Sequence, residues 1–158
     1  MFTGALAASY YGIPRTTMDI DIVVKITRED LQTLMIALRK AEVQINAQRI
    51  NNAFNSDFRV ITLKDKKSPF TLDIILYDRK LKKKVGTILG LPTFYQTPEE
   101  LILSKLRMIK ATFLKERTQK DKDDIRAILR YTAVNMKTIK RRAKKEKTLF
   151  IFEELGIQ

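Results

Sequence analysis

Apolar side chains follow two different patterns along the chain, and the pattern changes between residues 90 and 97. In the first part, β-branched and aliphatic residues form short runs separated by turn residues, which is typical of strands. The strands predicted in this way span 19–26, 58–63, 70–77 and 85–89. Leucines recur instead at helical spacing over 28–42, which predicts a helix behind a capping box of Thr27 and Asp30. Residues 47–56 are polar and stay unassigned.

From residue 97 onward the apolar spacing is helical. Thr97 is expected to cap the first of these helices, with Pro98 at its first position and Glu100 three residues after the cap. The apolar positions of this helix extend to Phe113. Because three independent start signals agree here, this boundary is the sharpest that the sequence offers.

Two further helices are predicted, one beginning near Asp121 and a basic one over 135–147. Strands followed by a run of helices indicate an α+β fold rather than a doubly wound sheet. We therefore expect a strand-bearing core at 1–96 and a helical C-terminal region at 97–158 that packs on it. The length of 158 residues suits one such domain.

Composition excludes several classes of chemistry. The chain has no Cys and no His, so disulfides, thiolate zinc sites, Cys nucleophiles and imidazole catalysis are ruled out. Catalysis would have to come from carboxylates, Lys, hydroxyl groups or a metal held by oxygen. No apolar run approaches the ~18 residues of a membrane span, and no signal peptide is evident. No membrane association and a cytoplasmic location are therefore expected.

Two aspartates open the first predicted strand. Asp19 and Asp21 are two residues apart, so both carboxylates point to the same face. Neighbouring negative charges need a positive partner, and Mg²⁺ takes oxygen ligands together with substrate phosphates. Asp73 stands in an otherwise apolar strand, where an unpaired carboxylate is costly. Beside the first strand, Asp73 would complete a three-carboxylate metal site.

Simpler interpretations of these residues remain open. Asp-x-Asp occurs by chance in loops, Asp73 is compatible with a strand edge, and Gly4 with an ordinary turn. The joint order of a glycine, then Arg-x-Thr-x-Asp-x-Asp, then a lone strand aspartate favours the metal site over these alternatives.

The segments TGA at 3–5 and GIPRTTMDIDIVV at 12–24 resemble the signature of the DNA polymerase beta-type nucleotidyltransferase superfamily. Within it, the branch of AbiEii-type toxins is the most similar. LILSKL at 101–106 resembles the third motif of that branch, a helix carrying a Lys, and RTQKDKDDI at 117–125 resembles its fourth. The resemblance covers roughly residues 3–130 and implies a nucleotidyltransferase-type mixed sheet with flanking helices.

The resemblance also implies roles for the acidic residues and the glycine turn. Asp19 and Asp21 would bind two Mg²⁺ ions, or Mn²⁺, together with the triphosphate of an NTP. Asp73 would bind the catalytic metal and act as the base toward the acceptor. Backbone N–H groups of Gly4 and Ala5 would approach the phosphates. The family usually has Ser or Gly where this chain has Ala5, so a phosphate contact from a hydroxyl group is missing here.

Further nucleotide contacts are implied at five positions. Arg15 and Thr17 would lie near the phosphates or fix the aspartate strand. Lys105 would reach the triphosphate, and Asp121 or Asp124 would orient it or the base. A solvated helix lysine at Lys105 and a helix cap at Asp121 are the structural alternatives.

The charge of the chain is strongly basic and unevenly distributed. The sequence has 31 Lys and Arg against 18 Asp and Glu, a net charge of +13. Most of this charge lies in 79–84 and 137–147, which suits a phosphate backbone. The candidate nucleic-acid contacts are Lys82, Lys83, Lys84, Arg141, Arg142, Lys144 and Lys145. A solvated basic helix, or one that docks an acidic protein, is the alternative.

These observations favour a metal-dependent nucleotidyltransferase that moves an NMP from an NTP to an acceptor, with RNA as the expected acceptor. The reaction would be in-line attack of the acceptor on the α-phosphorus, with release of pyrophosphate. The alternative is a catalytically weak or inactive nucleic-acid-binding or toxin–antitoxin protein of the same fold, with an antitoxin or other protein as its partner.

Overall fold

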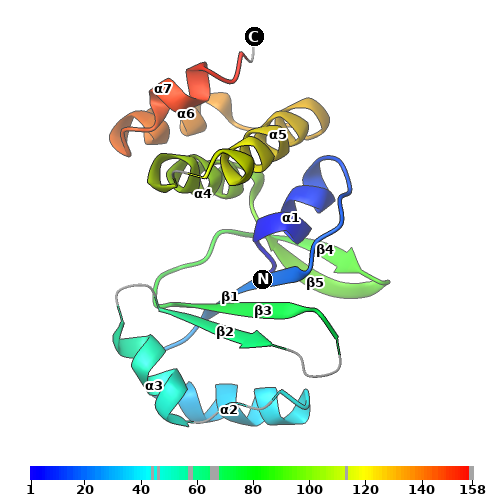
Figure 1. The fold of residues 1–158 in the computed structure, drawn as a ribbon, viewed down its shortest axis with the longest axis vertical. Coiled ribbons are helices and arrows are strands. Elements are labelled where there is room, and N and C mark those ends of the chain that lie inside the picture. The colour runs from blue at the N-terminus through cyan, green and yellow to red at the C-terminus, as the bar shows by residue number, and fades with distance from the viewer. Residues whose placement is uncertain (44, 46, 57–58, 65–67, 113, 157–158) are drawn as a thin grey trace.

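The chain forms a mixed sheet with helices on both sides (Figure 1). The computed structural model describes residues 1–43, 45, 47–56, 59–64, 68–112 and 114–156. In chain order the elements are α1 (Gly4–Tyr11), β1 (Asp19–Lys25), α2 (Leu31–Lys40), α3 (Ala47–Asn55), β2 (Val60–Lys64), β3 (Thr71–Tyr77), β4 (Lys83–Ile88), β5 (Leu91–Gln96), α4 (Pro98–Ala111), α5 (Lys115–Tyr131), α6 (Met136–Lys145) and α7 (Leu149–Glu153). The predicted α+β class is confirmed.

The strands form two sets that the N-terminal residues join. β3 lies in the centre of a three-stranded sheet, parallel to β1 and antiparallel to β2, and β4 and β5 form an antiparallel hairpin. Phe2 bridges to Ile22 of β1 and to Tyr95 of β5. The Phe2 N–H donates to the Phe94 carbonyl at 2.7 Å, and the Phe2 carbonyl accepts from the Gln96 N–H at 2.9 Å. The N-terminal segment thus connects the hairpin to the sheet.

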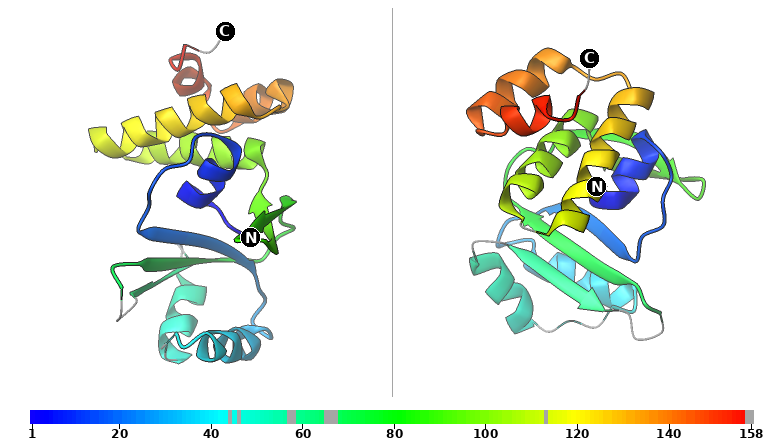
Figure 2. Two further views of the ribbon diagram at one scale, coloured as in Figure 1. Left: turned by 90° about the vertical axis from the view of Figure 1, so that its right-hand side faces the viewer. Right: turned by 45° about the horizontal axis from the view of Figure 1, so that its top comes forward.

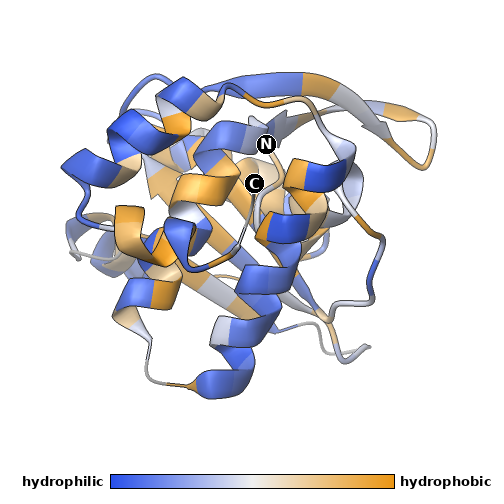
Figure 3. Ribbon diagram, turned by 90° about the horizontal axis from the view of Figure 1, so that it is seen from above, coloured by the Kyte–Doolittle hydropathy of each residue, from blue (hydrophilic) through white to orange (hydrophobic). Residues whose placement is uncertain are grey.

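Two apolar cores lie on opposite sides of the sheet. Below it, α2 and α3 cover the inward side chains of β2 and β3, with Ile74 fully buried (Figure 1). Above it, α1 packs against α4 and α5, and this core continues to α6 and α7 (Figure 2). Seen from above, hydrophilic residues follow much of the outer surface of these helices, and apolar stretches lie where they meet (Figure 3). The upper core therefore joins residues from both sides of position 96.

The first three strands are close to their predictions. β1 begins at Asp19, as expected, and β3 places Ile74 and Asp73 on opposite faces. β2 begins at Val60 rather than at residue 58, which lies outside the described residues, as do residues 65–67 between β2 and β3. The helix predicted from residue 28 begins at Leu31, because the Asp30 carboxylate accepts from Thr27 at 2.8 Å one residue before it.

The apolar pattern did not predict several elements correctly, in part because their sequences are polar or basic. The unassigned segment 47–56 contains helix α3, whose buried residues Ile50 and Ala53 give it only a narrow apolar side. The basic segment 79–84 ends within a strand, because β4 already includes Lys83 and Lys84. Strand β5 was not predicted. The chain reverses through Leu89 and Gly90, both at positive φ, in a two-residue hairpin connection.

The helical region departs from prediction in two respects. α4 begins at Pro98 behind Thr97, as expected, but Thr97 makes no side-chain cap hydrogen bond, and Glu100 turns toward Lys82 and Arg142 instead. α5 begins at Lys115 rather than near Asp121. Residues 115–120 are mostly strong helix formers, but they have no apolar side, so the apolar spacing does not reveal them. Residue 113 lies outside the described residues. No helix in the described ranges is both long and apolar enough to cross a membrane.

Replacing Ile102 tests the upper core. Ile102 of α4 is fully buried, so Ile102→Ala should lower the free energy of unfolding by about 2–5 kcal/mol. Met108→Ala is the matched control, because Met108 on the same helix is 40% exposed and should cost about 0.5 kcal/mol. Urea denaturation measures both values, and equal losses would contradict the assigned core.

Candidate functional site

The predicted aspartates lie on one face of neighbouring strands. In the parallel pair β1–β3, Asp21 lies directly opposite Asp73 and Asp19 opposite Thr71. All four residues line one cleft, whereas Leu72 and Ile74 face the lower core. The strand alternation that the sequence indicated is confirmed, and it brings carboxylates from two distant segments together.

Asp73 carries an unusual oxygen. Its Oδ1 is buried and has no hydrogen-bond partner among the described residues. A buried carboxylate oxygen without a donor loses its hydration and gains nothing in return. The position therefore suits a partner that comes from outside the chain, such as a cation or a hydroxyl group.

The electrostatic state of Asp21 reflects the same crowding. Burial raises the pKa of Asp21, and the negative charges of Asp73 and Asp19 raise it further. Lys105 and Arg117 act in the opposite direction and compensate only in part. The site is thus short of positive charge close to its carboxylates, which is the condition that a bound cation relieves.

Gly4 is required by the site geometry. Its φ is +58°, and a Cβ built at this position would lie 1.9 Å from Oδ2 of Asp21. Both conditions select glycine, because any side chain would be strained and would overlap the carboxylate. Gly4 and Ala5 open helix α1 and line the cleft, and the first N–H groups of a helix have no acceptor within it.

Two threonines position Asp19. The Asp19 N–H donates to Oγ1 of Thr17 at 3.1 Å, and the same hydroxyl group contacts the Asp19 carbonyl. Thr71 donates from Oγ1 to the Asp19 carboxylate at 3.0 Å. Thr17 was a candidate, and its contacts fix the aspartate strand. Thr71 was not singled out, because only the strand register places it opposite Asp19.

A network of four charges, buried at Lys105 and Asp124, lies beside the cleft. Lys105 Nζ lies 2.8 Å from Asp121 Oδ1 and 2.7 Å from Asp124 Oδ2. Arg15 donates from Nε and Nη2 to the two oxygens of Asp124, both at 3.0 Å. Lys105 is 5% exposed, so the alternative of a solvated lysine is wrong. Asp121 lies within α5 and is not its cap.

The cleft between the sheet and the upper helices has a volume of about 1500 Å³. Its lining includes Gly4, Ala5, Arg15, Thr17, Asp19, Asp21, Asp73, Lys105 and Asp121, with Arg117 and Lys120 from the start of α5. In the described part of the chain, no three acidic side chains stand close enough to form a preassembled metal cluster. The three aspartates thus share a face and a cleft without closing on one point.

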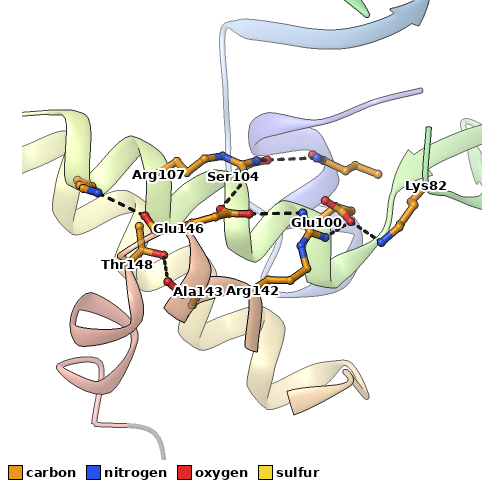
Figure 4. Close-up of polar contacts among 10 residues, drawn as sticks. Lys82, Glu100, Ser104, Arg107, Arg142, Ala143, Glu146 and Thr148 are labelled. Carbon is orange, nitrogen blue, oxygen red and sulfur yellow. Dashed lines mark hydrogen bonds and ion pairs between the residues drawn. The ribbon is translucent and has the colours of Figure 1, made fainter. Parts of the chain in front are cut away.

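The candidate nucleic-acid residues divide into three groups. Lys82 and Arg142 line the cleft and pair with Glu100 (Figure 4). Lys83 lies 3.7 Å above the Phe94 ring and Lys84 5.5 Å from the Tyr11 ring. The remaining three, on α6, are exposed: Arg141, Lys144 and Lys145. Glu100 was expected to complete a cap, and no local pattern pointed to its cationic partners.

Comparison with known proteins agrees with this geometry at the level of fold. No family model matches the sequence, and no curated protein matches it. The crystal structure of an antigenic nucleotidyltransferase-like protein from Paracoccidioides brasiliensis is similar, with a TM-score of 0.54 over 94% of this chain and 82% of that chain. The chain has a nucleotidyltransferase-like fold. The sequence identity is 13%, so the likeness concerns the fold, and the toxin-like branch rests on the sequence motifs alone.

Replacing Gly4 tests its contact with Asp21. Gly4→Ala should lower the free energy of unfolding by about 2–5 kcal/mol, because a strained φ and an overlap with the carboxylate add together. Gly90→Ala is the matched control, since Gly90 also has a positive φ but has nothing within 4 Å of its added Cβ. The control should lose only about 1–2 kcal/mol. Equal losses would mean that the carboxylate does not press on Gly4.

The raised pKa of Asp21 predicts a pH-dependent effect of Asp21→Asn in metal-free protein. Because the folded-state pKa of Asp21 lies above the ordinary value of 3.8, ionisation of this group destabilises the fold as pH rises through the folded pKa. Asp21→Asn should therefore raise the melting temperature at neutral pH and lose this advantage below pH 3.8. The difference in melting temperature between the two proteins at the same pH removes the contribution of titrating groups that both proteins share. A lower melting temperature of the variant at neutral pH would contradict the crowding.

Proposed function

We propose that this protein is a metal-dependent nucleotidyltransferase that transfers an NMP from an NTP to an acceptor. The observation that carries the proposal is the opposition of Asp21 and Asp73 on parallel strands, under a glycine that no other residue can replace. The unpartnered Oδ1 of Asp73 and the raised pKa of Asp21 support it, because both indicate carboxylates arranged for a ligand from outside. The nucleotidyltransferase-like fold is consistent with it.

Asp19, Asp21 and Asp73 are the residues that would hold the metal. Their donor atoms are all carboxylate oxygens, which suits Mg²⁺ or Mn²⁺. When bound, such ions neutralise phosphate charge and polarise the phosphoryl group that is transferred. Thr17 and Thr71 already hold Asp19 at the edge of the cleft through hydrogen bonds of 3.0–3.1 Å.

The chain's own residues supply the other requirements of the reaction. The first N–H groups of α1, at Gly4 and Ala5, present donors to a phosphate. Arg117 and Lys120 line the cleft, where their positive charge would suit a bound triphosphate. Asp73 Oδ1 accepts the proton of the attacking hydroxyl group, since it has no other donor in the described part of the chain.

RNA is the proposed acceptor. α6 carries six basic residues and no acidic one, and Arg141, Lys144 and Lys145 on it are exposed. Arg142 of the same helix lines the cleft, so the basic surface reaches the site. A catalytically inactive nucleic-acid-binding or toxin–antitoxin protein of the same fold would show the same basic surface but no turnover, and it is the outcome to exclude.

The test combines ligand binding with turnover. Mg²⁺ plus an NTP should raise the melting temperature, and the double variant Asp19→Asn with Asp21→Asn should abolish that rise. Transfer of radiolabel from α-labelled NTPs to total cellular RNA should be detectable. Asp73→Asn should slow this transfer about 10²–10⁴-fold through loss of the base.

Asp123→Asn is the control for these variants, because Asp123 is an exposed aspartate of α5 that pairs with Arg126. It should keep both the melting-temperature rise and the transfer. An unchanged rise in the double variant would place the ions elsewhere. A wild-type protein that transfers no label from any NTP would leave the inactive binding protein as the better description.

A further inference from the structure

One wall of the cleft carries ion pairs that the proposed nucleotide site does not use. Lys82 Nζ lies 3.0 Å from Glu100 Oε1, and Arg142 contacts the same oxygen (Figure 4). Arg142 Nη2 also lies 3.5 Å from Glu146 Oε1. Arg107 donates from Nη1 to the other oxygen of this carboxylate, Glu146 Oε2, at 2.8 Å. We refer to these five residues as the rim cluster. Its three cations come from the segment before β4, from α4 and from α6, and all three line the cleft.

Hydrogen bonds connect the rim cluster to the aspartate strand. Arg107 Nη2 donates to Ser104 Oγ at 2.8 Å, and Gln96 Nε2 donates to the same oxygen at 3.2 Å. Gln96 Oε1 accepts from the Thr3 hydroxyl group, and the Thr3 N–H donates to the Asp21 carbonyl at 3.0 Å. A group bound at the rim cluster is thus a short series of polar contacts away from Asp21, in the same cleft.

Glu100 is the carboxylate that holds Lys82 and Arg142 together. Burial alone raises its pKa, but hydrogen bonds from Arg142 and Lys82 outweigh burial and hold the pKa of Glu100 below its usual value. Glu100 is therefore ionised at neutral pH. A phosphate group offers more acceptor oxygens than a carboxylate, and a guanidinium group binds two of them at once. The same cations thus suit a phosphate in place of Glu100.

We propose that the rim cluster binds a phosphate group of the RNA acceptor, which replaces Glu100 between Lys82 and Arg142. The identity of the acceptor rests on the proposed function. From Arg142 the RNA backbone continues along the exposed side of α6, where Arg141 and Lys145 follow. The cluster thereby guides the acceptor from the basic helix into the cleft that contains the aspartates.

The test is fluorescence anisotropy with a labelled short single-stranded RNA, in EDTA and without NTP. Arg142→Gln should weaken binding about tenfold through loss of a charge-assisted phosphate contact. It should also reduce the slope of log affinity against log salt by about 0.7, the value for one phosphate contact on a single strand. Glu100→Gln should strengthen binding, because it removes the carboxylate that competes with the phosphate.

Two features keep the test decisive. Arg39→Gln is the matched control, because Arg39 is an exposed arginine of α2 at the opposite end of the molecule and should bind RNA as the wild type does (Figure 1). The gain expected for Glu100→Gln cannot arise from loss of folded protein. Unchanged or weaker binding by Glu100→Gln, or wild-type affinity in Arg142→Gln, would overturn the proposal.

Competition separates RNA from small phosphorylated acceptors. Inorganic phosphate and a nucleoside 5′-monophosphate should compete only weakly with the oligonucleotide. A mononucleotide that binds as tightly as the oligonucleotide would overturn the RNA assignment. Failure of the proposed function gives a different result, namely no transfer from any NTP while RNA binding still responds to Arg142→Gln and Glu100→Gln.

Discussion

The parallel pairing of β1 with β3 is the constraint on which the rest of the structure depends. Its register places Asp21 opposite Asp73, and strand alternation sends Leu72 and Ile74 to the other face. A shift of one residue in β3 would bury the Asp73 carboxylate against α2 and α3 and turn Ile74 toward the cleft. The apolar core below the sheet therefore maintains the register of the polar site above it.

The repulsion that this register creates is compensated from the upper helices. Lys105 and Arg117 lower the pKa of Asp21 against the effect of burial and of its acidic neighbours. Lys105 is itself held by Asp121 and Asp124, at distances below 3 Å and largely out of solvent. Removing one partner of such a buried network leaves an uncompensated charge. The helical region thus completes the electrostatics of the site, and α1 packs with it in a shared apolar core.

Much of this arrangement is visible in the sequence. The alternation of Asp19, Asp21 and Asp73 with apolar neighbours predicts both the strands and the face that the carboxylates share. The start of α4 at Pro98 is equally evident, because the proline ring fixes φ at a helical value. The first position of a helix also does not need the N–H group that proline lacks. The α+β class follows from the change of apolar spacing near residue 97. These features depend on neighbours a few residues away, so local pattern is sufficient for them.

Other features depend on contacts between distant segments, and only the tertiary structure decides them. Glu100 looks like a capping residue in the sequence, yet it pairs with Lys82 and Arg142. Nothing near Gly4 in the sequence shows that Asp21 leaves no room for a Cβ. The sequence by itself determined β1, β3 and α4 and the polar face of the two strands, because side-chain period and propensity act locally. The charge partners were decided by packing, because ion pairs depend on distance in space and not on separation along the chain.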